Sequence, residues 1–169
     1  YPLEATRYVL LDLSAMSHPA SHPASYRASD KEPDPGIIID LTRHLQKAGY
    51  IPIYVRPEYL DVLVQDPDLC ADVLYEGGLF LGSKRGLLGR LGRRSQDALL
   101  YMISQGYIAA IASFAVHHEF DTPHLGEAGA LLASEFSVSA AELLLDVNPG
   151  RILRGEMPFV PDFAERPID

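Results

Sequence analysis

The amino-acid sequence predicts an α/β fold in which parallel strands form a sheet and helices lie outside it. Short apolar runs typical of buried strands alternate along the chain with amphipathic segments typical of helices. Glycine and proline residues, which interrupt regular structure, separate many of these segments. A length of 169 residues is enough for one domain with its own core. Four expected strands could form an open sheet or part of a (β/α) barrel, because a complete barrel needs about 250 residues.

The expected elements follow one another in the order strand, helix, strand, helix. Strands are expected at residues 7–13, 51–55, 79–81 and 108–112, and helices at about 35–48, 67–76, 93–105, 124–135 and 138–146. Asn148 and Pro149 are expected to open a last short turn. Residues 14–35 contain four prolines and predict a long loop insertion, and residues 82–92 predict a loop rich in glycine and arginine. Residues 157–169 predict an extended tail.

Composition and charge exclude several classes of protein. The chain is 47% hydrophobic and 22% charged, which is typical of globular proteins and excludes a disordered chain or a fibrous repeat. The net charge of −9 predicts no binding to nucleic acid, because cations must offset the phosphates. No apolar run reaches the roughly 20 residues of a membrane helix, so no membrane span is expected. The single cysteine, Cys70, is expected in the core, and the cysteine count fits a reducing, cytoplasmic compartment.

Functional residues of an α/β fold are expected in the loops that follow the strands. Asp12 ends the first expected strand, where it could bind a metal ion or cap the following turn. Arg56 and Glu58 follow the second strand. They could bind a phosphate and position a base, or they could form a local ion pair worth about 0–1 kcal/mol.

Residues 82–94 are strongly basic. The cations of this segment are Lys84, Arg85, Arg90, Arg93 and Arg94, and no acidic residue lies among them. Backbone amides at a helix start, together with arginines, could bind a phosphate. The segment lacks the Gly-Lys-Ser/Thr sequence of a P-loop. The alternative is a solvated loop that places cations on an acidic protein.

Residues 117–124 bring several possible metal ligands together. They are His117, His118, Glu119, Asp121 and His124. Imidazole and carboxylate groups suit zinc, manganese or iron. Their spacing matches no established metal motif, so a polar loop that faces water is the alternative.

Short segments in six places along the chain resemble one protein family. They are residues 6–12, 49–58, 88–96, 111–113, 123–128 and 148–153. In this order they are similar to segments of the bacterial tyrosine-protein phosphatases of the PHP superfamily, the CpsB/YwqE group of capsule and exopolysaccharide biosynthesis. The resemblance implies that residues 1–156 are the C-terminal part of a PHP-like domain. It also implies a partial or distorted PHP-type (β/α) barrel with a metal site, usually of manganese, at the strand ends.

A phosphatase with residual activity would use the residues singled out above. Asp12, His117 and His118 are expected to bind the metal, and Arg56, Lys84, Arg85, Arg90 and Arg93 are expected to bind the phosphate. The implied substrate is a tyrosine-phosphorylated protein, such as the tail of a polysaccharide-assembly kinase. No catalytic residue is assigned.

Several family ligands are replaced in this chain. The family's opening His-x-His motif lies upstream of Tyr1, Arg56 stands in place of a histidine ligand, and Tyr59 stands in place of an arginine. Phe114 and Val116 stand where the family has an aspartate and a histidine. Phenylalanine and valine offer no lone pair, and arginine places a positive charge where a cation would bind.

These replacements predict weakened or lost catalysis, that is, a pseudoenzyme. A slip of one or two residues could still bring His117 or His118 to the position of Val116. The expected cofactor is manganese or another divalent metal if the protein is active, and the alternative is that no metal is bound. The alternative function is a non-catalytic regulator of a polysaccharide-assembly tyrosine kinase that acts by binding a phosphopeptide or a partner protein. An N-terminal truncation would expose a sheet edge, which a homo-oligomer could cover.

Overall fold

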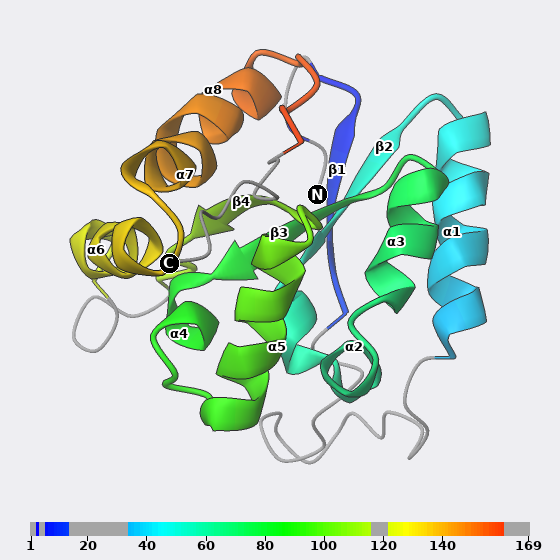
Figure 1. Ribbon diagram of the computed structural model, residues 1–169. Helices are drawn as coiled ribbons and strands as arrows, with labels where there is room; N and C mark the ends of the chain where they lie inside the picture. The colour runs from blue at the N-terminus through cyan, green and yellow to red at the C-terminus, as the bar shows by residue number, and fades with distance from the viewer. Residues whose placement is uncertain (1–2, 4–5, 14–33, 116–121, 161–169) are drawn as a thin grey trace.

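The computed structural model describes residues 3, 6–13, 34–115 and 122–160, in which a parallel sheet runs between layers of helices (Figure 1). Its strands are β1 (Tyr8–Asp12), β2 (Ile51–Val55), β3 (Leu79–Ser83) and β4 (Ile108–Ala112). They lie side by side in chain order, and all neighbouring pairs are parallel. The predicted α/β class is therefore confirmed. The described strands form an open sheet. Neighbouring strands of a barrel have the same parallel order, so the sheet also fits the predicted partial barrel.

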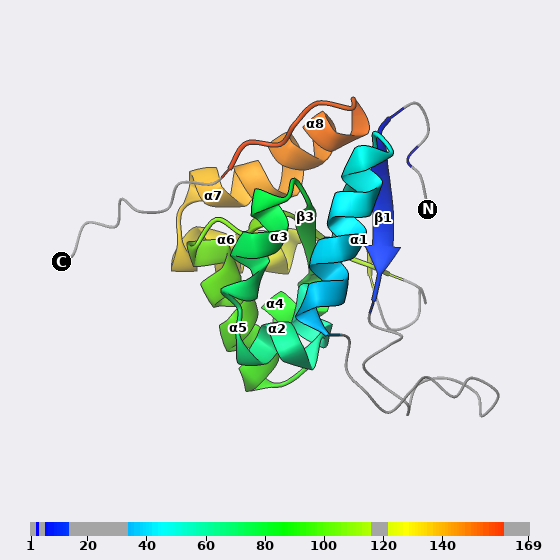
Figure 2. The same ribbon diagram turned by 90° about the vertical axis from the view of Figure 1, so that its right-hand side faces the viewer.

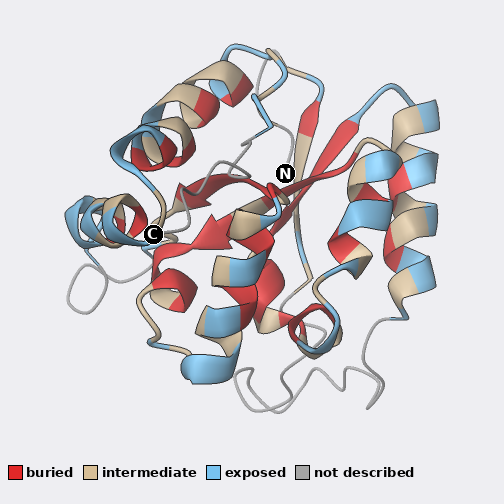
Figure 3. Ribbon diagram, viewed as in Figure 1, coloured by how far each residue is buried: buried red, intermediate tan, exposed pale blue. Residues whose placement is uncertain are grey.

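Three helices connect successive strands and cover one face of the sheet. They are α1 (Pro35–Lys47), α3 (Leu69–Tyr75) and α5 (Arg93–Ser104), and the α1 start is capped by the Asp34 side chain, which accepts the Gly36 N–H. Their buried side chains join Tyr54 and Phe80 of the sheet in one core cluster. Figure 3 shows the burial concentrated on the strands and on the inward sides of these helices. Cys70 belongs to this cluster and is fully buried, as predicted.

The chain after β4 forms α6 (Gly126–Glu135), α7 (Val138–Glu142), the π-helical segment η3 (Leu143–Val147) and α8 (Asn148–Leu153). Ile152 of α8 packs with Tyr8, Ile53 and Ala109 on the other face of the sheet. Figure 2 shows α8 beside the start of β1, at the end of the sheet where the strands begin. We call this second face the inner face.

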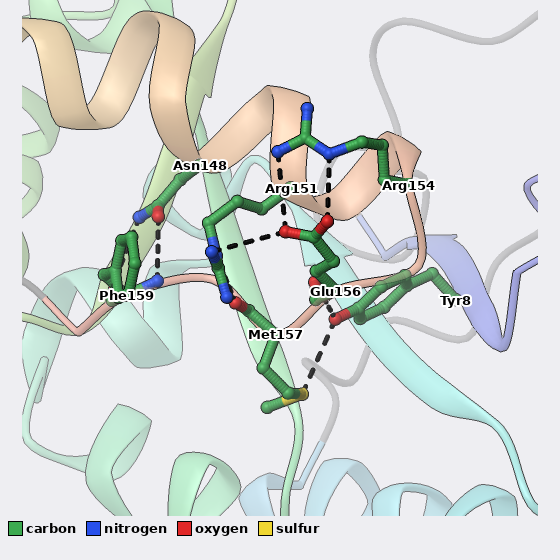
Figure 4. Close-up of polar contacts among 7 residues, drawn as sticks. All are labelled: Tyr8, Asn148, Arg151, Arg154, Glu156, Met157 and Phe159. Atoms are coloured by element: carbon green, nitrogen blue, oxygen red, sulfur yellow. Dashed lines mark hydrogen bonds and ion pairs between the residues drawn. The ribbon is translucent and has the colours of Figure 1, made fainter.

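The segment after α8 is fastened to the sheet through its backbone (Figure 4). The buried Asn148 side chain donates to the Ala109 carbonyl of β4 at 2.8 Å. It also donates to the Phe159 carbonyl at 2.9 Å and accepts the Phe159 N–H at 2.8 Å. The Tyr8 hydroxyl donates to the Glu156 carbonyl at 2.7 Å, and Arg151 Nε donates to the Met157 carbonyl at 2.7 Å. The start of the predicted tail thus belongs to the folded unit.

The structure corrects the predicted elements in three places. The predicted loop at 82–92 is wrong at its start, because β3 reaches Ser83 and α4 (Lys84–Leu87) follows, capped by a 3.0 Å bond from the Gly86 N–H to Ser83 Oγ. Two short segments, η2 (Pro57–Tyr59) and α2 (Asp61–Gln65), lie where no element was predicted. The predicted turn at Asn148 is a helix, because the wide turn of η3 leads directly into α8. No helix in the described ranges is long and apolar enough to cross a membrane.

Candidate functional site

The carboxyl ends of the four strands meet at one edge of the sheet, and three of the predicted loops touch there. Arg56, which follows β2, forms an ion pair through Nη2 with Oδ2 of Asp12 at the end of β1. Its guanidinium carbon lies 5.7 Å from the centroid of the Phe114 ring, which follows β4. It also lies 5.1 Å from the centroid of the Tyr59 ring in η2. We call Asp12, Arg56, Tyr59 and Phe114 the strand-end site.

Two residues of the strand-end site have unusual backbone conformations. Arg56 has φ of 60° and Phe114 has φ of 47°, and they are the only residues other than glycine with positive φ in the described ranges. This conformation is costly for residues with a Cβ atom, and it concentrates at functional sites where the surroundings enforce it. These two residues also contact each other, so we take this edge of the sheet as the candidate site.

Glu58 is a further residue of this edge whose burial the sequence did not reveal. It is 1% exposed, and its Oε1 accepts the backbone N–H of Ser83 at 3.0 Å. Its Oε2 has no hydrogen-bond partner among the described residues. Burial raises the pKa of Glu58 to about 7, although the hydrogen bonds with Ser83 and the nearby charge of Arg56 oppose the shift. The Glu58 side chain thus joins the ends of β2 and β3 directly behind Arg56.

Gly86 in α4 is the sequence signal that could have revealed this packing. A Cβ atom at Gly86 would lie 2.7 Å from Glu58 Oε1, closer than real Cβ atoms approach. Gly86 lies inside α4 and is not among the glycines with positive φ. Glycine is therefore required here by the close approach of the buried Glu58 side chain and not by the backbone conformation.

The other predicted phosphate-binding residues have separate contacts. Lys84 is 2% exposed, and its Nζ donates to the Thr122 carbonyl at 2.6 Å, to Thr122 Oγ1 at 3.3 Å and to the His124 carbonyl at 3.2 Å. These bonds use all three donors of the ammonium group, so Lys84 fastens the segment before α6. Arg85 lies half-buried on α4.

Arg90 and Arg93 lie at the surface with their own acidic neighbours. Arg90 pairs with Glu127 at 3.1 Å, and Arg93 pairs with Asp97 at 3.7 Å. Exposed ion pairs of this kind contribute about 0–1 kcal/mol. Of the five predicted cations, Arg56 is the one that the described contacts place in the strand-end site.

The predicted metal ligands can be placed only in part. His117 and His118 lie in the range 116–121, outside the described residues. Asp12 lies in the strand-end site, where its carboxylate pairs with Arg56. Within the described part of the chain, no group of three histidine, cysteine or acidic residues is arranged to hold a metal ion. The described donors therefore do not fit a divalent metal site.

Comparison with known proteins supports the fold. No family model and no curated protein matches the chain. Among solved structures, it is similar to a chain from the crystal structures of YwqE from Bacillus subtilis and CpsB from Streptococcus pneumoniae, which are metal-dependent tyrosine phosphatases. The TM-score is 0.71 at 24% identity, and the match covers 95% of this chain and 59% of the solved chain. The predicted resemblance is thus confirmed for the fold, which this chain shares over somewhat more than half the length of that phosphatase.

Proposed function

We propose that this protein is a relative of the metal-dependent tyrosine phosphatases with weakened or lost hydrolysis, and that its strand-end site binds phosphotyrosine. The observation that supports this most directly is the ion pair between Arg56 and Asp12. It occupies the edge of the sheet at which α/β proteins place their functional groups.

This ion pair opposes a metal ion in the strand-end site. The positively charged guanidinium group of Arg56 repels a divalent cation. Asp12 would have to leave Arg56 before its carboxylate could serve as a ligand. The Phe114 ring beside Arg56 offers no lone pair. Weakened metal binding would weaken hydrolysis by the mechanism expected of the family.

The same residues suit a phosphate monoester on an aromatic ring. A guanidinium group binds phosphate through parallel, charge-assisted hydrogen bonds. The Tyr59 and Phe114 rings beside Arg56 add aromatic surface on which the tyrosine ring could pack. We propose that the phosphotyrosine belongs to a protein partner such as a bacterial kinase of capsule or exopolysaccharide assembly. We further propose that both act in the cytoplasm and that residues 1–156, together with the docked segment at Met157 and Phe159, form the binding domain.

The proposal is tested by metal content and peptide binding on the same preparation. Protein purified without chelator is analysed for manganese and iron by mass spectrometry, and no stoichiometric metal is expected. Fluorescence anisotropy then compares a phosphotyrosine peptide with its unphosphorylated form, with and without EDTA. The phosphorylated peptide should bind more tightly, and EDTA should have no effect.

Two matched variants locate the binding site. Arg56→Gln should weaken phosphopeptide binding at least about tenfold, because a hydrogen bond to a charged group is lost. Arg94→Gln removes the same charge from an exposed position on α5 and should have little effect. Stoichiometric metal together with rapid hydrolysis of the phosphopeptide would contradict weakened catalysis. Equal affinity for both peptides would contradict the binding role.

A further inference from the structure

An apolar cavity of about 350 Å³ lies on the inner face of the sheet. Residues of all four strands line it, together with α8 and the residues around η3 and α6. Among the described residues that line it, Ser113 is the only one with a polar side chain. This volume falls within the range of about 300–1,000 Å³ that small-molecule sites occupy.

The cavity extends along the strands toward the strand-end site. Ile152 and Leu153 of α8 line it near the start of the strands, and Ser113 lines it just beyond the end of β4. Ser113 directly precedes Phe114, whose ring contacts Arg56. Leu81, another lining residue, accepts the Arg56 backbone N–H through its carbonyl at 2.8 Å.

The alternation of β1 gives a third connection. Side chains two residues apart on a strand point to the same face. Leu10 lines the cavity, so Asp12 lies on the same face one position further along the strand. The ion pair of Asp12 with Arg56 therefore stands at the carboxyl end of the apolar cavity.

From this juxtaposition we infer that the cavity and the strand-end site form one amphipathic site, which takes an aliphatic phosphate monoester with its phosphate at Arg56 and its hydrocarbon part in the cavity. The inference rests on the proposed anion binding at Arg56 and adds a ligand class with an apolar chain. Burial of hydrocarbon against leucine, isoleucine and alanine side chains provides the driving force. The phosphate competes with Asp12 for the guanidinium group.

The test is a chain-length series. Methyl, butyl and octyl phosphate are titrated into the full chain by calorimetry, below the micelle concentration of the octyl ester, with octanol as the uncharged probe. Affinity should rise about fourfold for each CH₂ group that becomes buried. Octanol should bind more weakly than octyl phosphate, and Arg56→Gln should remove that difference.

Variants that fill the cavity separate its contribution from that of Arg56. Ala112→Leu projects new atoms into the cavity and should abolish the chain-length dependence while methyl phosphate still binds. Ser113→Leu serves the same purpose if the first variant does not fold. Ala71→Leu adds the same side chain on the exposed side of α3 and should leave the series unchanged.

Each result decides between the two proposals. Equal affinity of methyl and octyl phosphate would overturn this inference and leave phosphotyrosine binding intact. Octanol binding as tightly as octyl phosphate would overturn the joint site. Failure of both methyl phosphate and the phosphotyrosine peptide to bind would overturn the proposed function itself.

Discussion

Arg56 and Phe114 follow different strands, and each adopts positive φ where the guanidinium group of one meets the ring of the other at 5.7 Å. The left-handed conformation costs a residue with a Cβ atom about 1–2 kcal/mol. The ion pair with Asp12 and the two flanking rings offset this cost at Arg56. Backbone strain is thus held in place by the same side-chain contacts that form the proposed binding site.

Two substitutions at Arg56 should separate strain from side-chain contacts. Arg56→Ala and Arg56→Gly both remove those contacts, but only glycine adopts φ near 60° without cost. The glycine variant should therefore be more stable than the alanine variant by about 1 kcal/mol in urea unfolding. At Arg43 in α1 the order should reverse, because alanine is favoured over glycine inside a helix by about 1 kcal/mol. If Arg56→Ala were more stable than Arg56→Gly, the claim of backbone strain at position 56 would be wrong.

Asp12→Asn should strengthen anion binding. The substitution removes the carboxylate that competes with a phosphate for Arg56 but keeps a side chain of the same size. A severalfold gain in affinity for methyl phosphate is expected, measured by calorimetry at low salt, where electrostatic effects are least screened. Asp40→Asn on α1, which removes an exposed carboxylate, provides the control. Weaker binding by Asp12→Asn would indicate that Asp12 holds Arg56 in its binding position.

Glu58 should make the protein less stable as the pH rises. Its pKa is about 7 in the folded protein and ordinary in the unfolded chain, so the folded state retains a proton that the unfolded state has lost. The free energy of unfolding should therefore fall between about pH 4.5 and pH 7, by up to roughly 3 kcal/mol. Glu58→Gln should lack this decrease. Its free energy of unfolding should therefore increase relative to that of the wild type as the pH rises from 5 to 8. Urea unfolding at both pH values measures the effect.

The control for this measurement is Glu142→Gln, which alters an exposed carboxyl group on α7. It should leave the pH dependence of stability unchanged. If the free energy of unfolding depends on pH in the same way for the wild type and Glu58→Gln, burial does not raise the pKa of the Glu58 carboxyl group.

Gly86→Ala should be destabilising although Gly86 lies in a helix. The new Cβ atom would lie 2.7 Å from Glu58 Oε1, so α4 or Glu58 must move. Overpacking of this kind costs about 1–3 kcal/mol. Gly126→Ala in α6 adds the same methyl group where no atom lies within 4 Å, and it should be neutral or stabilising. The melting temperatures of the two variants are compared by thermal unfolding. Equal values would exclude the close approach between position 86 and the Glu58 side chain.

The elements with a clear periodicity were predictable from the sequence, and the site was predictable in outline. Apolar runs such as residues 51–55 and 108–112 are strands as expected, because buried parallel strands are apolar on both faces. The convergence of Asp12, Arg56 and Phe114 followed from the parallel order of the strands. The burial of Lys84 and Glu58 did not, because both side chains are ordinarily exposed and their partners are distant in the chain.

Asn148→Ala should loosen the segment after α8 without unfolding the sheet. Asn148 is the only asparagine of the chain, and its amide group bonds to Ala109 on β4 and to both backbone groups of Phe159. Alanine leaves the buried Ala109 carbonyl without this donor, which costs about 1–3 kcal/mol. Hydrogen exchange should therefore accelerate at Phe159, while the amides of β2 in the centre of the sheet remain the best protected.

Asn148→Asp refines this test, since a carboxylate still accepts the Phe159 N–H but cannot donate to either carbonyl group. It should destabilise at least as strongly as alanine, whereas Gln105→Ala at an exposed site should have no effect. Unchanged exchange at Phe159 in both Asn148 variants would mean that Tyr8 and Arg151, which bond to the Glu156 and Met157 carbonyls, hold the segment by themselves.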